Sequence, residues 1–143
     1  MVFRVLDATA FYAGIPFASN DSFMTTSMVY EEIEHIKTKQ GALEMLQQTN
    51  RLQIRDPTEK SIISVTDASI KTGDNSTISK QDISIVALAL ENNIELITDD
   101  FAVTNVAKQL KIKTSSLMTK GISIVGKWIS YCSIWGKEFS QQK

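Results

Sequence analysis

The sequence predicts an α/β domain with a central, mostly parallel sheet flanked by helices. Three observations predict this fold class. Apolar runs of strand length alternate along the chain with segments of helical periodicity, as in domains built from strand–helix–strand units. The length of 143 residues is that of one domain. The 43% hydrophobic and 22% charged fractions are typical of a folded globular protein.

The composition excludes several classes of protein. No apolar run approaches the roughly 20 residues of a membrane-spanning helix, so we expect no membrane partner. The chain reaches Asp7 after six residues, which is too early for a signal peptide. Cys132 is the only cysteine, which excludes an internal disulfide and a zinc site with several cysteine ligands. We therefore expect a protein of the reducing cytoplasm.

Charge is divided unevenly along the chain. Residues 1–100 contain 15 acids and 8 bases, whereas residues 101–143 contain 1 acid and 7 lysines. Such asymmetry indicates either an acidic site beside a basic contact surface or an acidic domain with a lysine-bearing tail of no consequence. Composition alone leaves both interpretations open.

Five segments have the length and apolar content of strands. They are residues 2–6, 23–26, 51–54, 95–98 and 112–114. The first strand ends at Asp7, and a loop of small and polar residues from Pro16 to Asp21 follows it. The third strand is stopped by Asp56 and Pro57.

Five helices are predicted between and after these strands. Thr26 or Ser27 can cap the first, whose apolar stripe is Val29, Ile33 and Ile36. Gly41 interrupts the pattern, and a second helix runs from there to about Gln48. A third begins at Thr58 and ends at Gly73, which is a good C-terminal signal. A fourth begins at Ser79, and a fifth covers residues 101–110. The helix that Ser79 opens is apolar on every side, so we expect it in the middle of the fold.

Acidic residues follow two of the predicted strands. Asp7 comes directly after the first strand, and Asp99 and Asp100 follow the strand at residues 95–98. In open α/β sheets, ligands bind beyond the carboxyl ends of the strands, so these acids are candidates for a shared site. Each can instead cap the helix that follows, and capping is the favoured role for Asp7 taken in isolation.

Two further acids lie on predicted helices. Asp82 fits a capping box with Ser79, in which its carboxylate faces backbone N–H groups. At about 100° per residue, Glu32 falls beside the apolar stripe of its helix, whereas Glu31 and Glu34 point away and should be solvated. Glu32 is thus predicted to face the sheet, where a carboxylate is costly unless a cation or hydrogen-bond donors meet it.

Together these acids offer hard oxygen ligands without a nearby cysteine or histidine motif. The set is Asp7, Glu32, Asp82 and Asp100. It favours Mg²⁺ or Mn²⁺ over zinc. Such a cluster would serve phosphoryl chemistry, in which metal ions bind phosphate oxygens and lower the pKa of a water. Four capped helices would give the same pattern, so the residues alone leave the metal site a hypothesis.

Four segments, in this order, resemble those of PIN-domain nucleases. They are VLDATAF, SMVYEEI, SKQDISIVALALE and ELITDDFAVTNVA. The ALALE and TDDFAVTNVA stretches are most similar to the NOB family, endoribonucleases that mature the 3′ end of small-subunit ribosomal RNA. The resemblance runs from residue 2 to about residue 115, and it implies a three-layer sandwich with helices on both faces of the sheet.

The resemblance implies a metal-dependent endoribonuclease that hydrolyses RNA with Mg²⁺ or Mn²⁺ and without zinc. The residues that would hold the ion and carry catalysis are Asp7, Glu32, Asp82 and Asp100. Asp99 would be an additional or substitute ligand, and Thr9 and Asn105 would support the site. The lysines that would hold the RNA backbone are Lys108, Lys120 and Lys127. The implied partners are a small-subunit rRNA precursor and the ribosomal subunit, and a homodimer stays open.

The chain departs from the NOB pattern near its C-terminus. That family continues into a zinc ribbon opened by Trp and Cys-x-x-Cys, whereas here Trp128 and Cys132 are followed by Trp135 in place of the second cysteine. One cysteine cannot form a Cys₄ site. We therefore expect a PIN-like nuclease domain over residues 1–118 and an extension over residues 119–143 that is a degenerate zinc-ribbon remnant.

Three other functions stay open. A VapC-type toxin, neutralised by an antitoxin, would share the PIN fold and the chemistry. A non-catalytic RNA-binding or ribosome-assembly factor would keep the fold and bind RNA without cleaving it. A phospho-accepting signalling domain would use Asp7, but no lysine follows the last predicted strand in a matching context.

Overall fold

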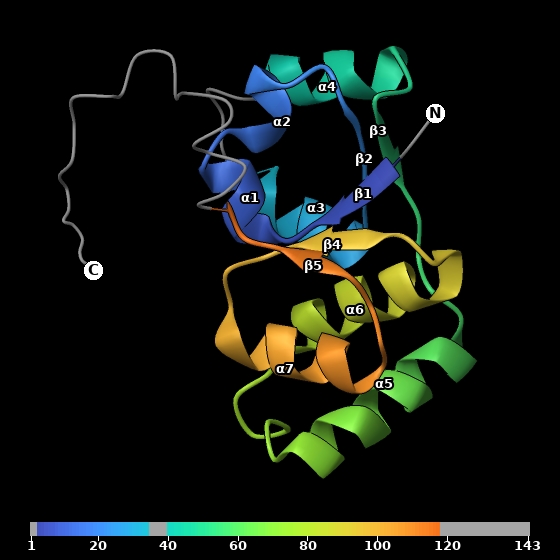
Figure 1. Cartoon of the computed structure of the whole chain (residues 1–143). Helices are drawn as coiled ribbons and strands as arrows, with labels where there is room; N and C mark the ends of the chain where they lie inside the picture. The colour runs from blue at the N-terminus through green and yellow to red at the C-terminus, as the bar shows by residue number, and fades with distance from the viewer. Residues whose placement is uncertain (1–2, 35–39, 118–143) are drawn as a thin grey trace, which may run out of the picture.

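A computed structural model describes residues 3–34 and 40–117 of the chain (Figure 1). In these residues, five strands form one sheet in the order β3-β2-β1-β4-β5, and every neighbouring pair is parallel. The strands are β1 (Phe3–Leu6), β2 (Ser22–Thr25), β3 (Leu52–Ile54), β4 (Glu95–Ile97) and β5 (Thr114–Ser115). The predicted α/β class is confirmed, and the described sheet is entirely parallel.

Helices cover both faces of the sheet and make three layers (Figure 1). On one side lie α1 (Ala8–Tyr12), α2 (Ile15–Ala18), α3 (Ser27–Ile33) and α4 (Gln40–Gln48). On the other side lie α5 (Glu59–Thr72), α6 (Lys80–Asn92) and α7 (Phe101–Gln109). This arrangement confirms the three-layer sandwich that the sequence resemblance implied.

Helix α6 forms the centre of the core, as its uniformly apolar sequence predicts. It packs against β1 and β4 on one side and against α5 and α7 on the other. The successive residues from Ile85 to Ala89 are each at most 1% exposed. Ser79 and Asp82 form the predicted capping box at its start. The core therefore fixes the start of α6 against the sheet.

The order of the strands reverses direction between β1 and β4. The chain runs outward from β1 through β2 to β3, then returns to place β4 on the other side of β1. In an open parallel sheet, the helices that follow two such strands diverge to opposite faces and leave a crevice at the carboxyl ends. Asp7 follows β1, and Asp99 and Asp100 follow β4. The topology thus brings these three acids to one crevice.

The predicted loop from Pro16 to Asp21 is partly wrong, because α2 occupies its first residues. Pro16 lies in the first turn of α2, where a missing N–H costs no helical hydrogen bond. Gly14 precedes the helix with φ of 81°, a left-handed conformation that glycine adopts without strain, and its carbonyl accepts from Phe17 N and Ala18 N. The short helix thus depends on a Gly–x–Pro start.

Several other boundaries differ from the prediction, most of them by one residue, as in β2, which is Ser22–Thr25 and not residues 23–26. Strand β5 begins at Thr114, because Ile112 N still donates to Ala107 O at the end of α7 and Lys111 adopts a left-handed turn with φ of 60°. Helix α4 begins at Gln40, so Gly41 lies inside its first turn and does not precede it. The predicted extension over residues 119–143, with Cys132, lies outside the described residues.

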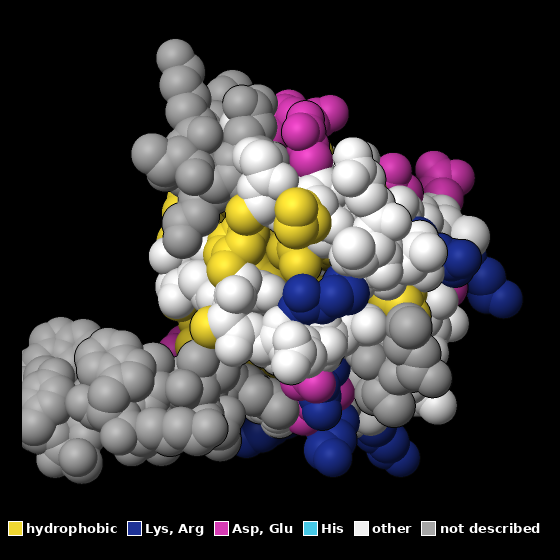
Figure 2. All heavy atoms as spheres, turned by 90° about the horizontal axis from the view of Figure 1, so that it is seen from above, with side chains coloured by type: hydrophobic (Ala, Val, Ile, Leu, Met, Phe, Trp, Pro, Cys, Tyr) yellow, Lys and Arg dark blue, Asp and Glu magenta, His cyan; other side chains and the backbone are white. Residues whose placement is uncertain are grey.

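Figure 2 shows the face of the molecule that carries α2 and α4. Apolar side chains gather there in a patch, with basic side chains beside it and acidic side chains toward the margins. Met45, on α4, is 64% exposed.

Among the helices that the structure describes, none has the length and apolar content to cross a membrane.

Replacement of Ile85 by alanine tests the role of α6 in the core. Ile85 is 0% exposed, so Ile85→Ala should lower the free energy of unfolding by about 2–5 kcal/mol. Ile70→Ala is the matched control, because Ile70 is 58% exposed and its loss should change stability by less than about 0.5 kcal/mol. Urea denaturation of both variants measures the difference, and equal losses would contradict the central position of α6.

Candidate functional site

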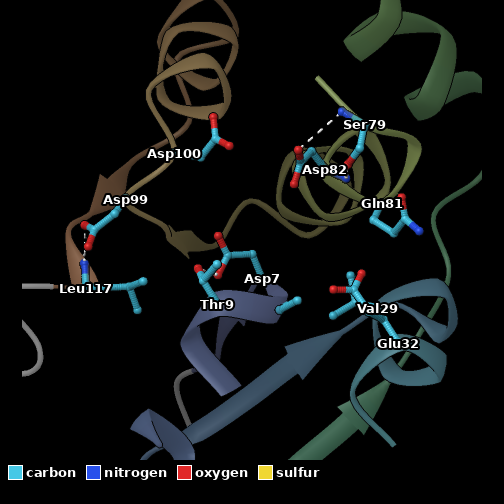
Figure 3. Close-up of a pocket in the computed structure, with 11 residues that line it drawn as sticks. Asp7, Thr9, Val29, Glu32, Ser79, Gln81, Asp82, Asp99, Asp100 and Leu117 are labelled. Carbon is cyan, nitrogen blue, oxygen red and sulfur yellow. Dashed lines mark hydrogen bonds between the residues drawn. The ribbon is translucent and has the colours of Figure 1, made fainter. Parts of the chain in front are cut away.

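A cavity of about 480 Å³ opens at the carboxyl ends of β1 and β4. All five acids predicted for the site line it, and they are Asp7, Glu32, Asp82, Asp99 and Asp100. None of the described residues that line it is a lysine or an arginine. The acids come from four separate regions of the sequence, and the fold brings them to one strongly negative hollow (Figure 3).

Asp7 is the buried member of the set, with 4% of its surface exposed. Its Oδ1 accepts hydrogen bonds from Thr9 Oγ1 at 2.7 Å and from Ala10 N at 3.0 Å, and its Oδ2 accepts from Thr98 Oγ1 at 2.7 Å. The bond from Ala10 N makes Asp7 the N-cap of α1. These donors stabilise the charged carboxylate in a buried place, and Thr9 also lines the cavity.

Thr98 is a site residue that the sequence reasoning missed. It is 3% exposed and stands directly after β4. Its hydroxyl donates to Asp7 Oδ2 and accepts from Asp100 N at 3.1 Å, so it joins the ends of two neighbouring strands. A polar residue at the end of a buried strand, just before two aspartates, was the available signal.

Asp82 and Asp100 both cap helices, as the sequence allowed. Asp82 Oδ2 accepts from Ser79 N at 3.3 Å, and Asp100 Oδ1 accepts from Val103 N at 3.1 Å. Asp100 Oδ2 accepts no hydrogen bond within residues 3–34 and 40–117, whereas the Asp82 carboxylate also takes part in a hydrogen bond with the Ser79 side chain. Asp100 can therefore cap a helix with one oxygen and offer the second to a ligand.

The acids influence one another electrostatically. Burial raises the pKa of Asp82, and the negative charges of Asp100 and Asp7 raise it further, while hydrogen bonds from Ser79 act in the opposite direction. A raised pKa means that the ionised form is disfavoured where it stands. A bound cation would offset both the cost of burying the Asp82 carboxylate and its repulsion from Asp100 and Asp7.

Glu32 lines the cavity at the edge of the sheet, on the side that the sequence predicts, but it is not enclosed as an interior-facing carboxylate would be. Val29 and Ile33 are at most 1% exposed, as their apolar stripe predicts, but Glu32 is exposed. The side of α3 next to the stripe borders the open cavity and not packed helix, so Glu32 reaches water. Figure 3 shows its carboxylate on the cavity side, opposite Asp82. Glu31 is exposed as predicted, whereas Glu34 is half-buried.

The remaining predicted residues lie further from the centre. Asp99 turns toward β5, where its Oδ1 accepts from Ser116 Oγ and Leu117 N, both at 2.7 Å (Figure 3). Asn105 and Lys108 lie on α7 and do not line the cavity. Lys120 and Lys127 lie outside the residues that the structure describes.

The charge of the acid set fits a divalent cation, but the carboxylates lie too far apart to hold one as they stand. Across residues 3–34 and 40–117, no three histidine, cysteine, aspartate or glutamate side chains are grouped closely enough to hold a metal ion as they stand. Carboxylates alone, without a lysine or arginine to neutralise them, are the donor set that Mg²⁺ or Mn²⁺ takes. Side chains would have to move inward to close around such an ion.

The sequence matches a family model described as the PIN domain of ribonuclease over residues 4–91, more than half of the chain. Endoribonuclease Nob1 of Pyrococcus abyssi is 31% identical over 137 residues, which is 96% of this chain and 81% of that protein. Endoribonuclease Nob1 of Methanocaldococcus jannaschii is 39% identical over 118 residues, 82% of this chain and 57% of that protein. Ribonuclease VapC1 of Thermoplasma acidophilum is 30% identical over 62% of this chain and 45% of that one.

Solved structures show the same fold at low sequence identity. A PilT N-terminus domain protein from Sulfolobus solfataricus P2 has a TM-score of 0.55 at 19% identity, covering 87% of this chain and 94% of that one. VapBC2 from Rickettsia felis, bound to a DNA fragment from its promoter, has a TM-score of 0.56 at 16% identity, covering 80% of this chain and 98% of the other.

Replacement of Asp82 by asparagine tests the electrostatics of the cavity. Because the pKa of Asp82 is raised above 3.8 in the folded state, the folded protein binds more protons than the unfolded chain above that pH. The contribution of Asp82 to stability therefore falls as pH rises through the interval between the two pKa values. In EDTA, the melting temperature of Asp82→Asn relative to wild type should rise from acid to neutral pH.

Asp67→Asn is the control, because Asp67 is an exposed aspartate on α5 that does not line the acidic cavity. Its melting temperature should follow that of the wild type across the same pH series. A difference between Asp82→Asn and wild type that stays constant or shrinks with rising pH would contradict the raised pKa.

Proposed function

The chain belongs to the PIN-domain ribonuclease family, and we propose that it cleaves RNA endonucleolytically with Mg²⁺ or Mn²⁺ in ribosomal RNA maturation. The observation that carries the proposal is one cavity lined by five carboxylates at the point where the sheet reverses its strand order. The 20S-pre-rRNA D-site endonuclease NOB1 of Saccharomyces cerevisiae, which is 36% identical over 56% of this chain and 17% of that protein, supports rRNA as the substrate class. A small-subunit rRNA precursor, cleaved in the cytoplasm near its 3′ end, is the proposed target.

The proposed metal ligands are Asp7, Glu32, Asp82 and Asp100, with Asp99 as an additional or substitute ligand. A divalent ion bound there would lower the pKa of a water and neutralise charge on the phosphate oxygens of the RNA. Asp7 is already oriented, because Thr9, Thr98 and the N-terminus of α1 hold both of its oxygens. Glu32 already lines the cavity and is exposed, so its side chain is able to move toward the other acids.

A VapC-type toxin is the second candidate within the family. Ribonuclease VapC1 matches 62% of this chain, whereas the Nob1 protein of P. abyssi matches 96% at a similar identity. Ribonuclease VapC3 of Aeropyrum pernix covers 82% of this chain at 28% identity, whereas Nob1 of M. jannaschii covers the same share at 39% identity, so the higher identity favours rRNA maturation. Copurification of a small antitoxin chain with the protein would favour the toxin instead.

Replacement of Asp7 by asparagine tests the proposed function. Asparagine keeps the shape and one acceptor oxygen, so the fold should survive, but the charge at the centre of the site is lost. We expect cleavage of an oligonucleotide from an rRNA precursor 3′ end, in Mn²⁺, to fall by more than ~100-fold, beyond the cost of losing an outer hydrogen-bond partner at a metal site. Single-turnover assays measure the rate.

Asp67→Asn again serves as the matched control and should cleave at the wild-type rate, since Asp67 is exposed and lines a separate hollow between α5 and the end of α7. Circular dichroism would establish that both variants are folded. Equal cleavage by wild type and Asp7→Asn would exclude the assigned site. Metal-independent RNA binding with no cleavage under any divalent ion would favour a non-catalytic RNA-binding factor.

Thr98→Val tests whether the buried hydroxyl prepares Asp7 for a metal ion. Valine matches the shape of threonine but cannot donate to Asp7 Oδ2 or accept from Asp100 N. Loss of such an outer partner should weaken Mn²⁺ binding by about 10–100-fold. Thr98→Ser keeps the hydroxyl and should stay close to wild type. Calorimetric titration with Mn²⁺ measures the affinities, and equal values for the two variants would refute the role of Thr98.

A further inference from the structure

A second cavity, of about 330 Å³, lies between α3, α5 and α6. The residues that line it are Met28, Ile62, Thr66, Lys80, Ile83 and Ser84. Its walls are almost entirely apolar, and Lys80 is the one charged side chain among the described lining residues. Met28 is 39% exposed there, although a methionine on a helix surface gains nothing from contact with water.

The apolar cavity and the acidic cavity share the same two helix starts. In the first turn of α3, Met28 lines the apolar cavity and the next residue, Val29, lines the acidic one. In the first turn of α6, Lys80 lines the apolar cavity, while Ser79 and Gln81 on either side of it line the acidic one. The two cavities are therefore neighbours on opposite sides of these first turns.

A hydrogen bond joins these helix starts. Thr26 Oγ1 and Ser84 Oγ lie 2.8 Å apart and connect the N-cap of α3 to α6, and both residues are buried. The spacing between the two cavities is thus set by core contacts and does not depend on surface loops. A ligand that reached both cavities would meet a preformed arrangement.

Of the two cavities, only the apolar one has a positively charged side chain among its described lining residues. The acidic cavity offers five carboxylates and, among its described lining residues, no base. A phosphodiester chain that enters it needs a cation beside the site to offset repulsion from the acids. Lys80 supplies one cation at this border, at the first position of α6. The apolar walls next to it suit the face of a nucleobase.

We propose that the apolar cavity is a nucleobase subsite for the RNA nucleotide adjacent to the cleaved phosphate. The base packs against Met28, Ile62 and Ile83, and the ammonium group of Lys80 contacts a backbone phosphate. This inference rests on the proposed endoribonuclease function, because the acidic cavity must hold the cleaved phosphate. It adds a second point of contact that fixes the RNA strand across the starts of α3 and α6.

The hydroxyl groups in the cavity are already engaged. Thr66 Oγ1 donates to Ile62 O at 2.8 Å, and Ser84 Oγ donates to Gln81 O at 2.6 Å and contacts Thr26 Oγ1. They have little capacity left to read the edge of a base. Recognition therefore rests on apolar packing, which accepts every base because each has an apolar face. Met28 suits this role, since its thioether is polarizable and pairs well with aromatic rings.

Two variants and two matched controls test the subsite by RNA binding. Fluorescence anisotropy with a labelled single-stranded oligoadenylate, in EDTA to prevent cleavage, measures affinity for the full chain. Met28→Ala should weaken binding about fivefold or more, the lower end of the cost of a lost base contact. Lys80→Ala should also weaken it and reduce the slope of log affinity against log salt by about 1.

The controls change the same residue types elsewhere. Met45→Ala removes an exposed methionine on α4, and Lys71→Ala removes an exposed lysine in the last turn of α5. Both should bind the oligoadenylate as the wild type does. Thermal unfolding followed by circular dichroism would verify that all four variants are folded, which is expected because none of these side chains is buried.

An abasic nucleotide identifies what occupies the cavity. A set of oligoadenylates, each with one abasic position, should include a position at which the wild type binds more weakly but Met28→Ala shows no further loss. Two results would refute the subsite. The first is that Met28→Ala binds RNA as tightly as Met45→Ala, and the second is that the abasic penalty is the same in wild type and Met28→Ala at every position. The cavity would then serve another ligand, such as an apolar side chain of a protein partner.

Failure of this inference is separable from failure of the proposed function. In EDTA, the difference in binding between each variant and its matched control reports on the subsite, whereas cleavage in Mn²⁺ by wild type and Asp7→Asn reports on the acidic cavity. Loss of cleavage in Asp7→Asn with unchanged binding in Met28→Ala would overturn the subsite and leave the nuclease intact. Equal cleavage by wild type and Asp7→Asn would overturn the nuclease site, on which the subsite rests.

Discussion

The buried carboxylate of Asp7 is the constraint on which the rest of the site depends. A charge in that place is costly, and the fold meets the cost with donors from three directions: the hydroxyl of Thr9, the backbone N–H of Ala10 and the hydroxyl of Thr98. These bonds join the end of β1, the start of α1 and the end of β4. Since Thr98 also accepts from Asp100 N, the position of one acid fixes that of another.

Capping and metal binding are compatible roles for the same residues. Asp7, Asp82 and Asp100 each cap a helix, and the N-terminus of a helix favours a negative charge. Helix ends thus hold the acids at the rim of one cavity, while mutual repulsion and burial leave the pKa of Asp82 raised. The fold stabilises each carboxylate singly and leaves the group as a whole short of positive charge. A bound divalent ion would supply the missing positive charge.

Local signals in the sequence were sufficient for most elements and for the choice of acids. Thr58 and Gly73 are the N-cap and C-cap of α5, as predicted, and Ser79 is the N-cap of α6. The strand order could not be predicted from local sequence signals, because it depends on contacts between residues far apart in the chain. The same limit explains the missed role of Thr98, whose partner lies 91 residues away, and the exposure of Glu32, which depends on what faces α3. The apolar cavity beside the site also joins three helices that local patterns do not bring together.

We propose that the acids bind divalent metal, although no three of them are grouped to hold an ion across residues 3–34 and 40–117. A crystal structure of the protein soaked in Mn²⁺, with anomalous diffraction, tests this claim most directly. The account predicts a strong anomalous peak in the acidic cavity within bonding distance of Asp7, Asp82 and Asp100, with Glu32 turned inward. An empty cavity in crystals of a protein that cleaves RNA in Mn²⁺, or a peak bound elsewhere on the chain, would contradict it.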